Sequence, residues 1–172
     1  MKTQKKLILL RHGQAKNAGA SESDAARELT EKGKNDAKNA GKHLQELGII
    51  PDLVLCSTTI RTRQTLANLQ ESVGCDLPVV HENKIYHAGE EELKKLIAQT
   101  SEDTKNLLLV GHNPAIHQLA VFLARSAKSE LVDSIYLQFL PCTMVVFSLS
   151  SEWKDLESTP SEIFSLFLPQ MA

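Results

Sequence analysis

Each of three short apolar runs in the sequence is followed by residues that could bind an anion. The runs and the residues after them are 7–10 with Arg11, His12 and Gly13; 53–56 with Ser57 and Arg61; and 107–110 with His112. In an open parallel sheet, ligands bind beyond the carboxyl ends of the strands, so we expect these side chains to converge. Two guanidiniums and two imidazoles beside helix N-termini would form a phosphate pocket. No nearby run of Asp or Glu suggests a metal, and we expect no cofactor.

The elements that must position these residues follow from the spacing of apolar residues. The three apolar runs predict strands that are buried on both faces, and therefore a parallel sheet. Helical stripes are predicted at Ala37–Leu47 behind the cap Thr30, Thr62–Val73, Leu93–Ile97 and Ile116–Leu123. Asn113 would cap the last of these helices, with Pro114 at its first position. The alternation predicts an α/β fold, a three-layer αβα sandwich with a mostly parallel central sheet.

The last third of the chain is less regular. The β-rich run Met144–Leu149 is expected to add an edge strand, and the polar segment 126–134 is expected to be a loop. The segment Ile163–Leu168 is apolar, and its pattern assigns neither a structure nor a role.

Length and charge exclude several classes of protein. With 172 residues and a formal net charge of −2, the chain is expected to form a single domain over 1–172. The near balance of charge argues against binding to nucleic acid and against a polybasic membrane binder. The apolar run behind the N-terminal lysines is too short for a secretory signal, so we expect a cytoplasmic protein with reduced Cys56, Cys75 and Cys142. The oligomeric state is left open.

Together these motifs resemble the histidine phosphatase superfamily, which is also called phosphoglycerate mutase-like. Arg11-His12-Gly13 is similar to its nucleophile motif, the stretch 57–65 to its second-strand motif, and Gly111-His112 to its second histidine motif. Thr58 and Thr62 depart from the Pro and Ala that are usual there. The pattern D-x-x-R-x-L-T-x-x-G resembles that of SixA-type phosphohistidine phosphatases, and here it consists of Asp24, Arg27, Leu29, Thr30 and Gly33.

The resemblance implies a reaction that needs no metal. His12 would attack phosphorus as a neutral imidazole and form a phosphohistidine, which water then hydrolyses. Arg11 and Arg61 would clamp phosphate oxygens, and His112 would be a further donor, preferably protonated. Gly13, Ser57 and Arg27 are additional candidates for substrate binding.

The proton donor of many relatives has no clear counterpart, and His87, Glu90, Glu91 or none of them could serve. A missing acid favours a phosphoramidate over an ester, because a leaving imidazole depends less on a dedicated donor. With only about 33 residues between the second helix and the strand at 107, no lid is expected over the pocket. We therefore expect a phosphohistidine-bearing protein as substrate, such as a histidine-containing phosphotransfer domain. The alternatives are a small phosphomonoester as substrate, or a module that binds a phosphorylated partner without turnover.

Several residues keep a structural interpretation beside the functional one. Arg27 could contact phosphate or brace its loop, and Ser57 could bind ligand, although a helix cap is favoured. Cys56 lies too few residues from Arg61 for a cysteine-phosphatase loop and is interpreted as a buried strand residue. His43, His81 and His117 lack the spacing of metal ligands and are also interpreted as structural.

Overall fold

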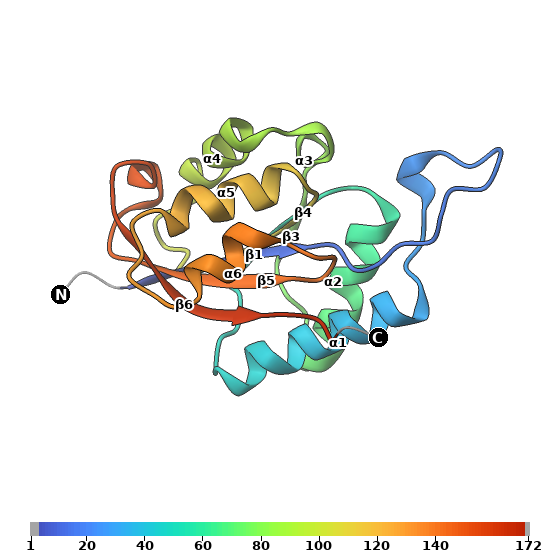
Figure 1. The fold of residues 1–172 in the computed structure, drawn as a ribbon, viewed down its shortest axis with the longest axis horizontal. Coiled ribbons are helices and arrows are strands. Elements are labelled where there is room, and N and C mark those ends of the chain that lie inside the picture. Colours follow the sequence, from blue (N-terminus) through green and yellow to red (C-terminus); the bar gives the residue numbers. More distant parts are fainter. Residues whose placement is uncertain (1–3, 171–172) are drawn as a thin grey trace.

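A computed structural model describes residues 4–170, which form one mixed sheet with helices on both faces (Figure 1). The strands are β1 (Lys5–Arg11), β2 (Leu53–Cys56), β3 (Val79–His81), β4 (Asn106–Gly111), β5 (Met144–Leu149) and β6 (Ser161–Phe167). The α-helices are α1 (Glu31–Glu46), α2 (Ile60–Val73), α3 (Lys84–His87), α4 (Glu90–Ala98), α5 (Ala115–Ala124) and α6 (Val132–Leu137). Two short 3₁₀ helices are η1 (Asp24–Ala26) and η2 (Trp153–Asp155).

The strand order is β3-β2-β4-β1-β5-β6. Strands β1 to β4 pair in parallel, and β5 runs antiparallel to both of its neighbours. The three apolar runs thus form adjacent parallel strands, as predicted. In the register between β1 and β4, Leu7 lies beside Leu107 and Arg11 beside Gly111, so the two strands end at the same level.

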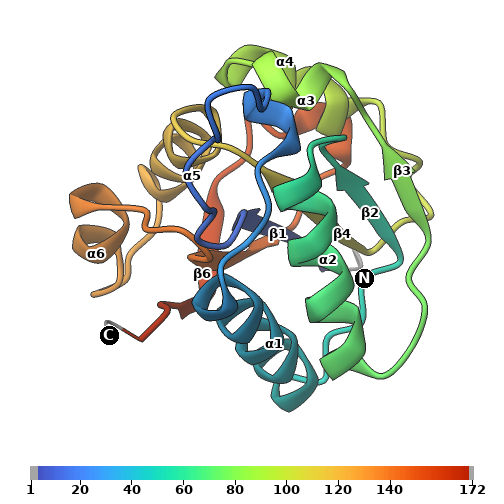
Figure 2. The ribbon, with the colours of Figure 1, turned by 90° about the vertical axis from the view of Figure 1, so that its right-hand side faces the viewer.

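The core has two halves, one on each face of the sheet. Alternate residues of β1 point to opposite faces: Ile8 and Leu10 pack with α1 and α2, while Leu7 and Leu9 pack with α4, α5 and α6. Figures 1 and 2 show α1 and α2 on one side of the sheet and α4 and α5 on the other. The predicted three-layer αβα sandwich is confirmed. The physical reason is that strands with two apolar faces need helices on both.

The expected edge position of the run Met144–Leu149 is wrong. The run Met144–Leu149 is a strand, but it does not lie at the edge of the sheet, because β6 pairs with its outer side. All six residues of β5 are buried as a result. The unassigned segment 163–168 supplies most of β6, whose bonds to β5 shift register between Val146 and Phe147.

The expected loop at 126–134 also ends earlier than predicted, because α6 begins at Val132. Ile135 is fully buried, and His117 Nε2 donates a hydrogen bond to its carbonyl oxygen at 2.7 Å. Helix α5 begins at Ala115 rather than at Pro114, and the Asn113–Pro114 peptide is cis. The Asn113 amide does not cap this helix; it donates to the Phe139 carbonyl at 3.0 Å.

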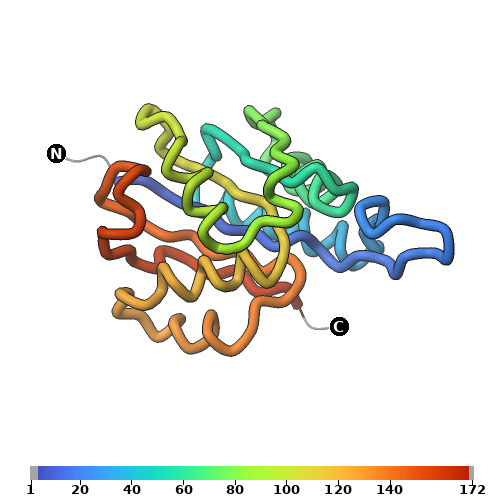
Figure 3. Tube along the Cα trace, turned by 90° about the horizontal axis from the view of Figure 1, so that it is seen from above, coloured from blue at the N-terminus to red at the C-terminus, as the bar shows by residue number. Residues whose placement is uncertain are grey.

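The segment 12–30 leaves the end of β1, projects from the body of the molecule and returns to α1 (Figures 1 and 3). Thr30 caps α1 as predicted, since its hydroxyl accepts from Gly33 N at 3.0 Å. The start of this segment contacts helix α1, where Gln14 packs against Gly33. A Cβ atom there would lie 2.2 Å from Gln14 O, so only glycine fits.

We expect Gly33→Ala to destabilise the protein by about 2 kcal/mol, because the methyl group would collide with backbone rather than with a flexible side chain. Gly19→Ala is a control in the adjoining segment 12–30, since its Cβ would meet no atom closer than 3.8 Å. Urea unfolding followed by circular dichroism measures both variants. Equal midpoints for the two would contradict this account of Gly33.

Candidate active site

The carboxyl ends of β2, β4 and β1 lie side by side at one end of the sheet. Hydrogen bonds join the residues that follow them: His12 N donates to Gly111 O at 3.0 Å, and Ser57 N donates to Val110 O at 3.1 Å. The rings of His12 and His112 lie 5.3 Å apart between centroids. Neighbouring parallel strands therefore bring the two imidazoles together from positions 100 residues apart in the sequence.

The His12 ring is buried and held in one tautomer. Its Nδ1 lies 2.7 Å from Gly13 O, and a carbonyl can only accept, so Nδ1 carries the proton. Burial, together with the nearby Arg61 and Arg11 charges, lowers the pKa of His12 to about 4. At neutral pH the ring is uncharged, and its Nε2 lone pair is free to attack. This agrees with the neutral imidazole predicted from the sequence.

The environment of His112 differs from the one expected. Its Nε2 lies 2.8 Å from Ser57 Oγ. Burial, together with the neighbouring His12, Arg61 and Arg11, lowers the pKa of His112 to about 3. The expectation of a protonated His112 is therefore wrong for this structure, because burial and the neighbouring positive charges disfavour a charged ring.

Both predicted arginines reach this end of the sheet and retain unpaired N–H groups. Arg11 Nη1 donates to Phe139 O at 2.9 Å, and both terminal nitrogens of Arg61 donate to Asp24. Among the residues described, Arg11 Nε, Arg61 Nε and His112 Nδ1 are buried without a partner. Buried polar groups nearly always have a partner, so their concentration here suits an anion that accepts several hydrogen bonds.

Comparisons with known proteins show the family of this chain. Residues 7–87 match the model of the histidine phosphatase superfamily (branch 1). A solved structure from Nakamurella multipartitia, provisionally named phosphohistidine phosphatase SixA, is 30% identical, with a TM-score of 0.85 over 96% of each chain. The chain belongs to the histidine phosphatase superfamily.

Two further relatives are similar over nearly their whole length. A structure from Agrobacterium tumefaciens, also provisionally named SixA, is 25% identical, with a TM-score of 0.79 over 96% of this chain and 98% of that one. An uncharacterised protein of Mycobacterium leprae is 28% identical over 86% of this chain and 90% of its own. The phosphoglycerate mutase-like fold is thus shown, and membership of the superfamily supports an enzyme of the histidine-phosphatase type.

The structure places the secondary candidates of this histidine phosphatase in supporting positions. The favoured interpretation of Ser57 as the cap of α2 is wrong. Thr59 is the N-cap residue, and Ser57 Oγ contacts His112. Gly13 lies at the site, but its N–H donates to Thr65 Oγ1 at 2.9 Å. Arg27 braces its loop through bonds to Lys16 O and the Asp24 carboxylate.

Sequence reasoning missed two contacts of the site. The sequence indicates Asp24 only as part of a motif, and in the structure it accepts hydrogen bonds from Arg61. No sequence pattern indicates Tyr86, whose ring lies 5.5 Å from that of His112 and whose hydroxyl donates to Asp24. The one available signal was the position of Asp24 within the motif, since Tyr86 follows no pattern.

The three candidates for a proton donor are engaged elsewhere or exposed. Glu90 and Glu91 both form ion pairs of 2.8 Å with Lys94. His87 is exposed, and its ring lies 4.2 Å from that of Tyr86. Pairing with Lys94 already engages both carboxylates, which does not favour them as proton donors.

Cys56 is fully buried within β2, as predicted. Burial raises the pKa of its thiol to about 12, so the thiolate that a cysteine nucleophile requires is not formed at neutral pH. The interpretation of Cys56 as a structural residue is confirmed.

The lowered pKa of His12 predicts where its ring titrates. We expect its Cε1 proton resonance to move with a midpoint near pH 4, below the ordinary value of 6.5. Protonation occupies the Nε2 lone pair, so kcat/KM should fall as the pH decreases through this value and stay level above it. NMR titration, with the resonance assigned by its loss in His12→Ala, measures the midpoint. A midpoint at 6.5 would contradict the described environment.

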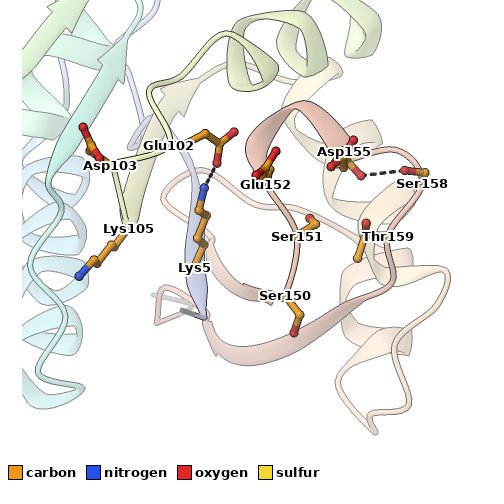
Figure 4. A pocket seen from close by; sticks show the side chains of 10 residues that line it. All are labelled: Lys5, Glu102, Asp103, Lys105, Ser150, Ser151, Glu152, Asp155, Ser158 and Thr159. Carbon is orange, nitrogen blue, oxygen red and sulfur yellow. Dashed lines mark hydrogen bonds and ion pairs between the residues drawn. The ribbon is translucent and has the colours of Figure 1, made fainter. Parts of the chain in front are cut away.

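A concave region lies at the opposite end of the sheet, where β1 begins (Figure 4). This cavity of about 770 Å³ carries the ion pair of the buried Lys5 with the exposed Glu102. Its other charged residues are Asp103, Lys105, Glu152 and Asp155. With four carboxylates against two lysines, it suits a phosphate poorly. Within 4–170, no group of three or more His, Cys, Asp or Glu is placed to hold a metal ion, and no helix is long and apolar enough to cross a membrane.

Proposed function

We propose that this histidine phosphatase hydrolyses phosphohistidine on proteins, through a phosphorylated His12. The observation that carries the proposal is the His12 ring, uncharged and with Nε2 free, beside two guanidiniums and a second imidazole. Nε2 attacks phosphorus, and the P–N bond to the substrate imidazole breaks as the new P–N bond to His12 forms. Water then attacks the phosphoryl group on His12 and releases inorganic phosphate.

Arg11 and Arg61 neutralise the charge on the equatorial oxygens while the phosphoryl group moves in line between the two nitrogens. Their buried Nε groups are donors already in place, which costs no reorganisation during the reaction. His112 can donate a single N–H in its neutral form. In this scheme the protein's own cations compensate the phosphate charge, and the reaction proceeds without a metal.

The acidic groups near the site support a phosphoramidate as substrate. In the part of the chain that the structure describes, the side-chain contacts of the two arginines and two histidines include one carboxylate, that of Asp24. A hydrogen bond from Tyr86 is the largest cause that holds the pKa of Asp24 well below its usual value. An ionised carboxylate cannot protonate an alkoxide, whereas a leaving imidazole can carry its proton on the second nitrogen.

The connection between α2 and β4 supports a protein as the phosphate donor. Residues 74–105 form only β3, α3 and α4, with no further element that would cover the strand ends. A small ligand is usually enclosed, but a protein surface needs open access. The two similar structures that carry the SixA name are consistent with a phosphohistidine protein, such as a histidine-containing phosphotransfer domain.

A substrate panel with EDTA present tests the proposal. The protein is mixed in turn with a phosphorylated histidine phosphotransfer domain, a phosphoserine peptide and small sugar phosphates, and released phosphate is measured. We expect the fastest release from the phosphotransfer domain. Faster release from sugar phosphates would favour a small-molecule phosphatase, and binding without any release would favour a non-catalytic module.

A further inference from the structure

Asp24 is the acceptor of four hydrogen bonds from three side chains. Arg61 donates through Nη1 to its backbone oxygen at 2.7 Å and through Nη2 to Oδ2 at 2.9 Å. Tyr86 donates its hydroxyl to Oδ2 at 2.6 Å, and Arg27 donates Nη1 to Oδ1 at 3.0 Å. Asp24 therefore joins Arg27, Arg61 and Tyr86 through both its carboxylate and its backbone oxygen.

These bonds connect three elements that are distant in the sequence. Asp24 begins η1, Arg61 lies in the first turn of α2, and Tyr86 lies in α3. Figure 2 shows the η1 turn beside α3 and the start of α2. The projecting segment 12–30 is thus tied to the helix that carries Arg61 at the point where that guanidinium is fixed.

The geometry of the contact between Asp24 and Arg61 indicates that Asp24 positions the guanidinium and does not occupy the place of a phosphate. One acceptor of Arg61 is a peptide carbonyl, which carries no net charge and does not mimic a phosphate. The Asp24 side chain is 51% exposed, whereas that of Arg61 is 6% exposed, so the carboxylate reaches the guanidinium from the solvent side. A guanidinium has five N–H donors; two are given to Asp24, and three remain for another acceptor.

We propose that Asp24 is a positioning residue that holds one edge of the Arg61 guanidinium and so directs its remaining N–H groups to the transferring phosphoryl group. The inference deepens the proposed function and rests on it, because it takes Arg61 as a phosphate ligand. Tyr86 and Arg27 keep the carboxylate in place, and Asp24 does not itself touch the substrate.

Asp24→Asn keeps the shape of the side chain and removes its charge and one acceptor. Orthovanadate affinity, measured by calorimetry, is expected to fall about 10-fold, with a loss of similar size in kcat/KM, because one charged hydrogen bond is lost. In an Arg61→Lys background the same change should have almost no effect, because the group on which Asp24 acts is gone. Glu22→Gln is the control, since it removes a carboxylate of the same segment that bonds only locally to Gly19.

The double-mutant cycle separates a positioning role from a merely structural one. Equal losses from Asp24→Asn with and without Arg61 would overturn the proposal, and so would tighter vanadate binding by Asp24→Asn, which would make the carboxylate an internal competitor. If Asp24→Asn does not fold, Tyr86→Phe takes its place, with a smaller loss of about 3-fold expected from one neutral donor.

The proposed function can fail independently of the positioning role of Asp24. If the unmodified protein binds orthovanadate but releases no phosphate from phosphohistidine, the substrate assignment is wrong while the cycle still measures the coupling between Asp24 and Arg61. If the unmodified protein does not bind orthovanadate, Arg61 is not an oxyanion ligand, and the positioning role is overturned as well.

Discussion

His12→Ala is expected to lower phosphate release by at least roughly 10⁴-fold, because no other group in the site replaces its Nε2 as nucleophile. Orthovanadate affinity should change by less than about 10-fold, because the two guanidiniums that bind the oxyanion remain. Rapid mixing with a radiolabelled phosphohistidine protein, followed by an alkaline quench, should trap label on His12 in the unmodified protein alone.

A second histidine provides the control for this experiment. His81 is exposed at the end of β3, so His81→Ala should retain both turnover and label. Label on another residue, or turnover by His12→Ala within 10-fold of the unmodified protein, would show that His12 is not the nucleophile.

Arg61→Lys is expected to reduce kcat/KM by about 10²-fold although the positive charge is kept. A lysine ammonium cannot reproduce the planar fork that bonds to Asp24 at two atoms and still offers N–H groups to phosphate. The loss should be present with every substrate that the enzyme accepts, because the phosphoryl group is common to all of them. Steady-state kinetics with two substrates measure it.

The matched control for Arg61 lies two residues further along the same helix. Arg63 is exposed, and Arg63→Lys should leave kcat/KM unchanged. Thermal unfolding of both variants shows whether the loss comes from the site or from weaker folding. Equal activity in the two variants would exclude a specific role for the Arg61 fork.

The sequence by itself determined the strands β1, β2, β4 and β5, the helices α1, α2 and α5, and the residues that stand where β1, β2 and β4 end. These features depend on local patterns: apolar runs, helical stripes, and polar residues that interrupt them. Because parallel strands end at a common edge, the meeting of His12 and His112 also followed from the sequence. The family motifs named the same residues independently.

Only the tertiary structure decided what these side chains contact. The strand Met144–Leu149 is internal because a segment with no clear pattern, 163–168, pairs with its outer side. Ser57 bonds to His112 instead of capping α2, since the cap belongs to Thr59. Hydrogen bonds of this kind join residues far apart in the chain, and no local pattern encodes them.

The charge states of the site were likewise decided by packing. A histidine has the same ordinary pKa wherever it stands in a sequence, and burial among positive charges makes His112 neutral here. The contacts of Asp24 with Arg61 and Tyr86 span 37 and 62 positions. They exist because folding brings η1, α2 and α3 to one place, which local sequence patterns do not specify.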